Sequence, residues 1–379
     1  MTEHFITEIE IDKLRHIENI NIALSEDKRQ HLILTGKNGS GKTSVLQRIK
    51  ALLSALNRTS KLESRNIYNI IGKNIHITIS FNQEKTLSAS YNHGDFITAF
   101  FPAVRPVNDI TEPKGVEEVT LKPAFTVEDD PAKDIAKYMV HLKTQQLYAK
   151  DANDTQTEQN IEAWFKRFED SLKILMNDDS IRIKYEYKKY SFEIQQDGRE
   201  QVNFNHLSDG YASVFRIFAD LIMRMDQNWL LNNQLSKYNK EGVVLIDEIE
   251  THLHLELQRT ILPSLIKLFP RVQFIISTHS PYVATSVSNA LIYDLERQTA
   301  LTNLSSYSVD DVAEGFFEAE SYSVKMEETL RRYKELLNKK DATDTERAER
   351  ARLRMELNEV PGKLAVTIRA EFDRLEQEQ

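Results

Sequence analysis

The chain has 379 residues, a formal net charge of −9, 40% hydrophobic residues and no cysteine. The length allows two or three domains, or one large core with insertions, and the lack of cysteine excludes disulfides, thiolate catalysis and cysteine-based zinc sites. No apolar run approaches the roughly 18 residues of a membrane span, and the acidic start MTEHFITEIEID is neither a signal nor a transit peptide, so we expect a cytoplasmic protein without a membrane partner.

The N-terminal third predicts short strands on either side of one glycine-rich loop. Alternating apolar residues predict an edge hairpin from Phe5 to Ile11 and from Ile20 to Ile22. Further strands are predicted at 32–34, 75–79 and 87–91, and the segment 100–106 is predicted to be the end of another strand. The polar stretch from 106 to 131, which contains proline and glycine, predicts a long loop.

The segment HLILTGKNGSGKTSVLQRIKALL, residues 31–53, fits the phosphate-loop pattern G-x-x-x-x-G-K-[ST]. It lies between a predicted strand and a predicted helix (44–53), which is the context that such a loop requires. Backbone N–H groups and the helix start attract phosphate, the lysine reaches the β- and γ-phosphates, and the Thr43 hydroxyl holds Mg²⁺. The expected nucleotide-binding residues are Gly36, Asn38, Gly39, Ser40, Gly41, Lys42, Thr43 and Ser44.

The middle of the chain predicts helices from about 132 to 176 and a β-hairpin after them, with Asp197-Gly198 as its turn. Residues 182–190 interleave basic and tyrosine side chains. This pattern favours the solvated face of a hairpin, and nucleic-acid binding is the alternative that stays open. Beyond this, the sequence predicts a helix after Gly210, a strand at 243–246, a helix from about 254, and strands at 272–276 and 290–294.

Two carboxylates end the apolar strand in VVLIDEIETHLH, residues 243–254. Beside a phosphate loop, Asp247 would orient Mg²⁺, usually through water. Glu248 points to the opposite side and would take a proton from the attacking water. His252 and His254 lie at i and i+2, on different helix faces, so a metal site formed by them is not expected.

Two further motifs accompany the phosphate loop and the strand that ends in two carboxylates. In HLSDGYASVFRIF, residues 206–218, the residues Ser208, Asp209 and Gly210 precede an amphipathic helix and offer a hydroxyl and N–H groups to a γ-phosphate. In FIISTHSPYV, residues 274–283, His279 follows a buried strand and would contact the γ-phosphate.

In this order the four motifs resemble those of ABC-type ATPases, over residues 5–295. Ser208-Asp209-Gly210 is similar to the signature motif, with Asp209 in place of one of its two glycines. No clear Q-loop glutamine is present, and Arg105 is expected to face the nucleotide in its place.

The pattern LIDEIETHLH…STHSPYV resembles the overcoming-lysogenization-defect (OLD) type of ATPase, which includes subunits of Septu, retron-associated and PARIS anti-phage systems. That group has DEPE-x-HLHP, and here Ile249 replaces the proline while Glu250, which would belong to the dimer-facing D-loop, is kept. The resemblance implies an α/β P-loop NTPase, with an ABC-like core sheet, an antiparallel β-subdomain, a helical insertion and a helical C-terminal segment.

Four regions follow from these assignments. They are an N-terminal part of the ATPase core with the phosphate loop (1–130), a helical insertion with a β-hairpin (131–200), a C-terminal core part (201–308) and a helical assembly segment (309–379). The last region shows no nuclease pattern, and Asp310-Asp311 are expected in a solvated turn. Leu353, Leu357 and Val360 form one apolar stripe and Leu364, Ile368, Phe372 and Leu375 another, which pack on a core or bind another protein.

The sequence therefore predicts an ATPase that uses ATP and Mg²⁺ but does not cut nucleic acid itself. By resemblance, two subunits sandwich ATP in a dimer or larger oligomer and control a separate nuclease or toxin effector in anti-phage defence. A DNA or phage-protein trigger is a hypothesis. The alternatives are a RecF-like or chromosome-maintenance ATPase that clamps DNA, and the motor subunit of a membrane transporter, which the long insertion argues against.

Overall fold

The structure, a computed structural model, describes residues 3–58, 67–72, 75–83, 86–106, 108–227, 238–302, 304–317, 324–339, 341, 343–358 and 372–375. Contacts divide the chain into two compact units, Met1–Val309 and Asp310–Gln379. In the described part no helix is long and apolar enough to cross a membrane.

A six-stranded sheet forms the centre of the first unit, in the order β13-β12-β3-β11-β10-β6. Its strands are β3 (His31–Thr35), β6 (Phe96–Phe101), β10 (Glu241–Ile246), β11 (Val272–Ser277), β12 (Ala290–Asp294) and β13 (Thr299–Leu301). All neighbours pair in parallel except β13, which is antiparallel to β12. The buried runs of β3, β10 and β11 are mainly apolar, as expected of parallel strands covered on both faces. The fold is that of an α/β P-loop NTPase.

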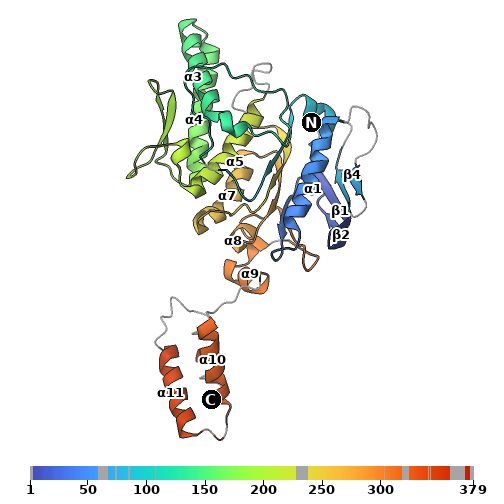
Figure 1. The fold of residues 1–379 in the computed structure, drawn as a ribbon, viewed down its shortest axis with the longest axis vertical. Coiled ribbons are helices and arrows are strands. Elements are labelled where there is room, and N and C mark those ends of the chain that lie inside the picture. The colour runs from blue at the N-terminus through green and yellow to red at the C-terminus, as the bar shows by residue number, and fades with distance from the viewer. Residues whose placement is uncertain are drawn as a thin grey trace. The chain divides into compact units, whose positions relative to one another are not determined.

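A four-stranded antiparallel sheet, in the order β2-β1-β5-β4, lies beside helix α1 (Figure 1). Its strands are β1 (Ile6–Leu14), β2 (Ile17–Ala23), β4 (Ile67–Gly72) and β5 (Ile75–Phe81). The predicted hairpin is confirmed, with Ile9 opposite Ile22 and Ile11 opposite Ile20, and β2 at the edge. Apolar residues of this sheet, of α1 (Lys42–Ser54) and of the central sheet form one core.

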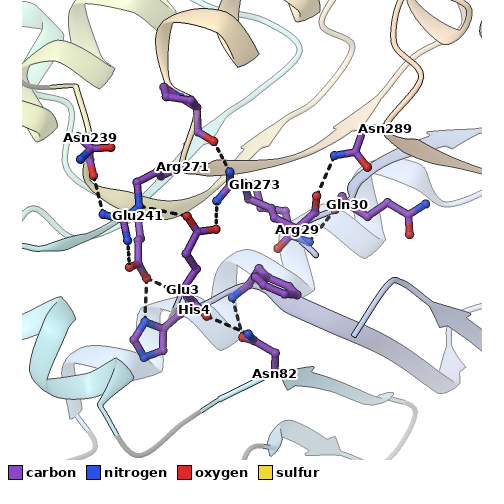
Figure 2. A network of polar contacts seen from close by, with 12 residues as sticks. Glu3, His4, Arg29, Gln30, Asn82, Asn239, Glu241, Arg271, Gln273 and Asn289 are labelled. Atoms are coloured by element: carbon purple, nitrogen blue, oxygen red, sulfur yellow. Dashed lines mark hydrogen bonds and ion pairs between the residues drawn. The ribbon is translucent and has the colours of Figure 1, made fainter. Parts of the chain in front are cut away.

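A polar network at the amino ends of the central strands ties the two sheets together (Figure 2). Glu241, at the start of β10, accepts hydrogen bonds from the backbone N–H and Nδ1 of His4, both at 2.8 Å, and pairs with Arg271. The buried Gln273 of β11 bonds both the N–H and the carbonyl of Ile6, at 2.8 and 2.9 Å. These contacts fix β1 against the central sheet at the end opposite the motifs.

The insertion forms two long helices, α3 (Ile135–Asp151) and α4 (Thr155–Met176), as predicted. The α4 helix begins where Asp154 accepts the Thr157 N–H at 3.1 Å, and ends at Asn177 with φ 51°. The buried carboxylate of Asp226, the last residue of α5 (Asp209–Asp226), accepts from Trp164 Nε1 at 2.6 Å and from the Tyr138 hydroxyl at 3.3 Å. The insertion is thereby fixed to the end of α5.

Two local predictions need correction. The predicted strand at 87–91 is helix α2 (Leu87–Asn92), because its buried residues, Leu87 and Tyr91, lie at i and i+4, a spacing that fits one helix face as well as alternation. The hairpin predicted after the insertion helices is instead a three-stranded sheet of β7 (Arg182–Glu186), β8 (Ser191–Gln195) and β9 (Val202–Asn203). Asp197-Gly198 joins β8 to β9, whereas β7 turns into β8 at 187–190, where Tyr190 has φ 51°.

The remaining elements are mostly helical. They are η1 (Ala55–Arg58), η2 (Pro131–Asp134), η3 (Phe204–His206), α7 (Leu255–Leu268), α8 (Pro281–Ala284), η4 (Leu304–Ser306), α9 (Val309–Gly315), α10 (Val324–Leu337) and α11 (Asp344–Asn358). Asp310 and Asp311 lie in the first turn of α9 rather than in a separate turn.

The second unit has an apolar core of its own, in which Leu353 and Leu357 of α11 contact Tyr333 and Leu336 of α10 together with Phe372 and Leu375. Four of the residues predicted for the two apolar stripes are thus buried within this unit. Val360, Leu364 and Ile368 lie outside the described residues.

Candidate nucleotide site

The carboxyl ends of the parallel strands gather the predicted motifs at one edge of the sheet. The phosphate loop follows β3, Asp247 and Glu248 follow β10, and His279 follows β11. Since β10, β11 and β3 are consecutive neighbours, these loops lie next to one another. This is where open α/β sheets bind ligands.

The phosphate loop has the backbone that its glycines require. Gly36, Gly39 and Gly41 have φ of 125°, 86° and 100°, values that other residues rarely adopt. A Cβ on Gly41 would also lie 2.4 Å from Cδ1 of Ile17 in β2. The loop can therefore approach a phosphate with bare backbone at the start of α1, whereas a side chain at Gly41 would collide with the antiparallel sheet.

Lys42 is the buried cation of this loop and is only 5% exposed. Its Nζ donates to the carbonyls of Gly36 at 2.7 Å and of Lys37 at 3.1 Å. Burial lowers the pKa of Lys42, while nearby carboxylates act in the opposite direction, in the order Glu248, Asp247, Glu250 and Asp294. The carboxylates, which include both that the sequence singles out, thus offset part of the effect of burial on the pKa of Lys42.

The other predicted loop residues differ in exposure. Thr43, in the first turn of α1, is exposed, as are Asn38 and Gly39, whereas Ser40 and Ser44 are partly buried. The Ser40 hydroxyl is inaccessible to solvent and has no hydrogen-bond partner in the described part of the chain.

Asp247 and Glu248 are held by a serine that the sequence analysis did not single out. The Ser277 hydroxyl, at the end of β11, donates to Asp247 Oδ1 at 2.5 Å and accepts the Glu248 N–H at 2.8 Å. Asp247 is buried, and Glu248 has φ 45°, a conformation that costs energy outside glycine. Ser277 directly precedes the Thr-His pair of the switch motif, and this position is the signal that was available in the sequence.

Glu250 connects the carboxylate strand to the switch loop. Its carboxylate accepts the Thr278 hydroxyl at 2.8 Å and the His279 N–H at 2.5 Å. Burial lowers the pKa of His279, and the Lys42 charge acts in the same direction. His279 therefore favours its neutral form near the phosphate loop.

Arg105 lies after β6 but does not take the position predicted for it. It is only 4% exposed, and its guanidinium donates to the carbonyls of Asp247 at 3.0 Å and Glu248 at 3.1 Å, and to the Ser213 hydroxyl of α5 at 2.8 Å. Burial lowers its pKa to about 10. The Arg105 guanidinium is thus bound to the carboxylate loop and to α5 instead of facing a nucleotide.

The signature residues lie at the start of α5, where Ser208 and Asp209 are exposed and Gly210 is buried. The Ser208 hydroxyl makes no capping hydrogen bond to the helix. A Cβ on Gly210 would lie 2.8 Å from the carbonyl oxygen of His252. The signature is therefore packed against the segment after Glu248. Among the described residues, no group of three or more His, Asp or Glu side chains could hold a metal ion, and this includes the surroundings of His252 and His254.

The donor set fits a magnesium–nucleotide. The loop offers an N–H cradle, one buried cation and the exposed Thr43 hydroxyl, and Asp247 keeps Oδ2 outside its bond to Ser277. Hydroxyl and carboxylate oxygens are the ligands that Mg²⁺ prefers.

Comparisons with known proteins match parts of this chain to two family models and to several relatives. The model of the family described as "AAA domain, putative AbiEii toxin, Type IV TA system" matches residues 145–285, and that of magnesium chelatase subunit ChlI matches residues 12–89. The Septu protein PtuA of Bacillus mycoides is 26% identical over 74% of this chain and 38% of its own length. The Septu protein PtuA of Bacillus thuringiensis is 26% identical over 76% of this chain and 75% of its own length.

A retron Vc95 probable ATPase of Vibrio cholerae is 37% identical over 34% of this chain and 24% of its own length. The chain therefore spans well under half the length of the first Septu protein and of the retron protein. Among solved structures, an Smc head bound to a domain of ScpA has a TM-score of 0.43 at 13% identity, covering 79% of this chain and 98% of that one. The chain is thus similar to two Septu PtuA proteins and, over a smaller part, to two retron probable ATPases.

Proposed function

We propose that this chain binds and hydrolyses ATP and acts as the switch subunit of an anti-phage defence system. The observation that carries the proposal is the convergence of Lys42, Asp247, Glu248 and His279 at one edge of the sheet, in the order of ABC-type motifs. The proposed role in defence rests on the similar proteins, which are named as Septu and retron proteins.

Each residue has a distinct task toward the nucleotide. The N–H groups of the loop and Lys42 neutralise the β- and γ-phosphates, and ATP releases Lys42 from its bonds to two loop carbonyls. Thr43 and Asp247 would hold Mg²⁺, which when bound would supply positive charge to offset the charge that develops on the phosphates.

Glu248 is the group that would accept a proton from the attacking water. It follows the buried Asp247 by one residue, and its backbone is fixed by Ser277. His279 is oriented through its own N–H by Glu250 and would donate to the γ-phosphate in its neutral form. A carboxylate base and a positioned donor are the groups that general-base hydrolysis uses.

Two subunits would complete each site. Ser208 and Asp209 are exposed at the start of α5, so they are free to meet a phosphate held by a second copy of the chain. ATP would then close the pair and hydrolysis would open it, and a separate nuclease or toxin effector would respond to the state. A DNA or a phage protein would be the trigger.

The Glu248→Gln variant tests this proposal. Glutamine keeps the shape of the side chain but cannot accept the proton, so we expect phosphate release to fall at least 100-fold while ATP binding is kept. In mass measurements with ATP and Mg²⁺, the variant should accumulate as a dimer or larger oligomer. Unchanged turnover in Glu248→Gln would show that the base has been wrongly assigned. If ATP does not change the mass of the variant, the ATP-dependent pairing of two subunits is contradicted.

A further inference from the structure

Helices α4 and α7 pack against each other, and a groove follows their line of contact. Two cavities of about 660 and 400 Å³ adjoin along it and share Ile174 and Lys267. The α4 wall consists of one helix face: Ala163, Lys166, Arg167, Asp170, Ser171 and Ile174. Because 11 residues separate Ala163 from Ile174, this α4–α7 groove follows about 16 Å of helix.

Four cations line the α4–α7 groove without a carboxylate partner in the described part of the chain. They are Lys166 and Arg167 on α4, and Arg259 and Lys267 on α7, and all four side chains are exposed. A fifth cation, Lys173, is neutralised by Glu169 at 2.8 Å and Asp170 at 3.2 Å.

This cluster is positive, whereas the whole chain has a formal net charge of −9. Of the two carboxylates in the lining, Asp170 is paired with Lys173, which leaves Asp179 to oppose the four cations. Positive charge on both walls of a groove favours a ligand that carries a row of negative charges.

The chemistry of the walls favours phosphate over an acidic protein segment. Protein partners usually bind through apolar anchors that enter desolvated pockets. Here the one aromatic ring in the lining, Tyr238, is covered by the Arg167 guanidinium at 5.2 Å. About 16 Å of groove matches about five phosphates of one strand, at 3.4 Å each along a duplex.

We propose that the α4–α7 groove binds the phosphate backbone of a nucleic acid without reading its sequence. Backbone contacts of this kind position a strand but carry no base information. The site lies outside the nucleotide-binding residues, so the proposal does not depend on ATP hydrolysis.

The test is fluorescence anisotropy of the full chain, without ATP, with labelled single-stranded and duplex oligonucleotides of mixed sequence. The variant Lys166→Gln/Lys267→Gln removes one cation from each wall. The matched control Lys184→Gln/Lys188→Gln removes two exposed cations of the β7–β8 hairpin that form no ion pair among the described residues, so both double variants lose the same charge. Thermal melting of both variants checks that the fold is kept.

We expect the groove variant to bind at least tenfold more weakly. Between about 50 and about 200 mM salt, the slope of log K against log salt should become shallower by about 1.4 for single strands or about 1.8 for duplex. The hairpin variant should behave as the wild type. The proposal is overturned if the wild type binds no oligonucleotide, if the hairpin variant alone loses binding, or if a poly-glutamate peptide binds the groove and oligonucleotides do not.

Discussion

Glu250 shows how a single side chain can set the position of another. It follows the strand that carries Asp247, yet both of its carboxylate oxygens accept hydrogen bonds from the switch loop, at Thr278 and His279. The Thr278 hydroxyl in turn accepts the Ser280 N–H at 3.0 Å, so the three residues of the loop are held together. Glu250 is thus a positioning residue for His279.

Replacing Glu250 with Gln should lower kcat by about tenfold and leave the affinity for ATP almost unchanged. The amide keeps one acceptor oxygen but turns its NH₂ toward one of two donors, and the loss of one charge-assisted bond costs about 1.5–3 kcal/mol. Steady-state kinetics together with equilibrium ATP binding would separate the two effects. Glu200→Gln, at an exposed position, is the control; an equal loss in both variants would exclude a positioning role.

His31 makes the folding stability depend on pH, independently of nucleotide binding. It is 3% exposed, and its Nδ1 accepts the Phe274 N–H at 3.1 Å, which requires the neutral ring. Burial, and secondarily the charge of Arg29, lowers the pKa of His31 from 6.5 to about 4. Because the folded-state pKa lies below the unfolded one, this stabilisation is complete above pH 6.5 and is lost as the pH falls from 6.5 to 4.

The variant His31→Asn should therefore reduce the acid sensitivity of folding. Asparagine can accept the same N–H through Oδ1 and does not titrate. Between pH 7.5 and pH 4 the wild type should lose about 3 kcal/mol more of its unfolding free energy than the variant. Urea titrations at a series of pH values measure this difference, and parallel pH profiles would mean that His31 is not the titrating group.

At the scale of elements, the start of α5 and the loop after β10 form one packed unit. Arg105 joins them by donating both to carbonyls of that loop and to Ser213 of α5, and Gly210 packs against the His252 carbonyl. A shift of α5 would therefore displace the loop after β10, and a shift of the loop would displace α5. The same contacts link the predicted signature to the predicted catalytic carboxylate within one chain.

The variant Gly210→Ala tests this close approach. Alanine favours a helix by about 1 kcal/mol over glycine, but its Cβ would lie 2.8 Å from the His252 oxygen, so α5 or the loop must shift. We expect ATP binding to be kept and the ATP-dependent dimer of Glu248→Gln to weaken at least tenfold. Gly115→Ala, where a Cβ meets nothing within 4 Å, is the control; dimers of equal strength would argue against a signature role.

At the scale of the whole molecule, the nucleotide site and the polar network of Figure 2 occupy opposite ends of the same parallel strands. The network fixes β1 to β10 and β11, and the neighbouring β2 supplies Ile17, which contacts the phosphate loop at Gly41. The antiparallel sheet thus supports the loop from the side. The helical unit from Asp310 onward has its own apolar core.

ATP should stabilise the folded chain as a whole through this one site. A ligand at 100 times its Kd adds about 2.7 kcal/mol to the unfolding free energy. A rise of the melting temperature with ATP and Mg²⁺ is expected for the wild type and should vanish in Lys42→Ala, as calorimetry or a dye-based melt can record. Persistence of the shift in Lys42→Ala would place the nucleotide elsewhere.

The sequence by itself determined the elements that carry strong local signals. The phosphate loop, the buried strands around it and the order of the motifs follow from glycine positions and apolar runs, which act over a few residues. The fold class follows from that order, because strands that alternate with helices close into a parallel sheet.

Only the tertiary structure decided which polar groups meet. Ser277 binds Asp247, Glu250 binds the switch loop and Arg105 supports the carbonyls of the carboxylate loop, although these partners lie 28 to 142 residues apart. Helix α2 (Leu87–Asn92) and the turn at 187–190 were also seen only in the structure, because the spacing of Leu87 and Tyr91 fits a helix as well as a strand. Local patterns report burial and backbone preference, whereas the partner of a buried charge is chosen by long-range packing, which one sequence does not encode in any short stretch.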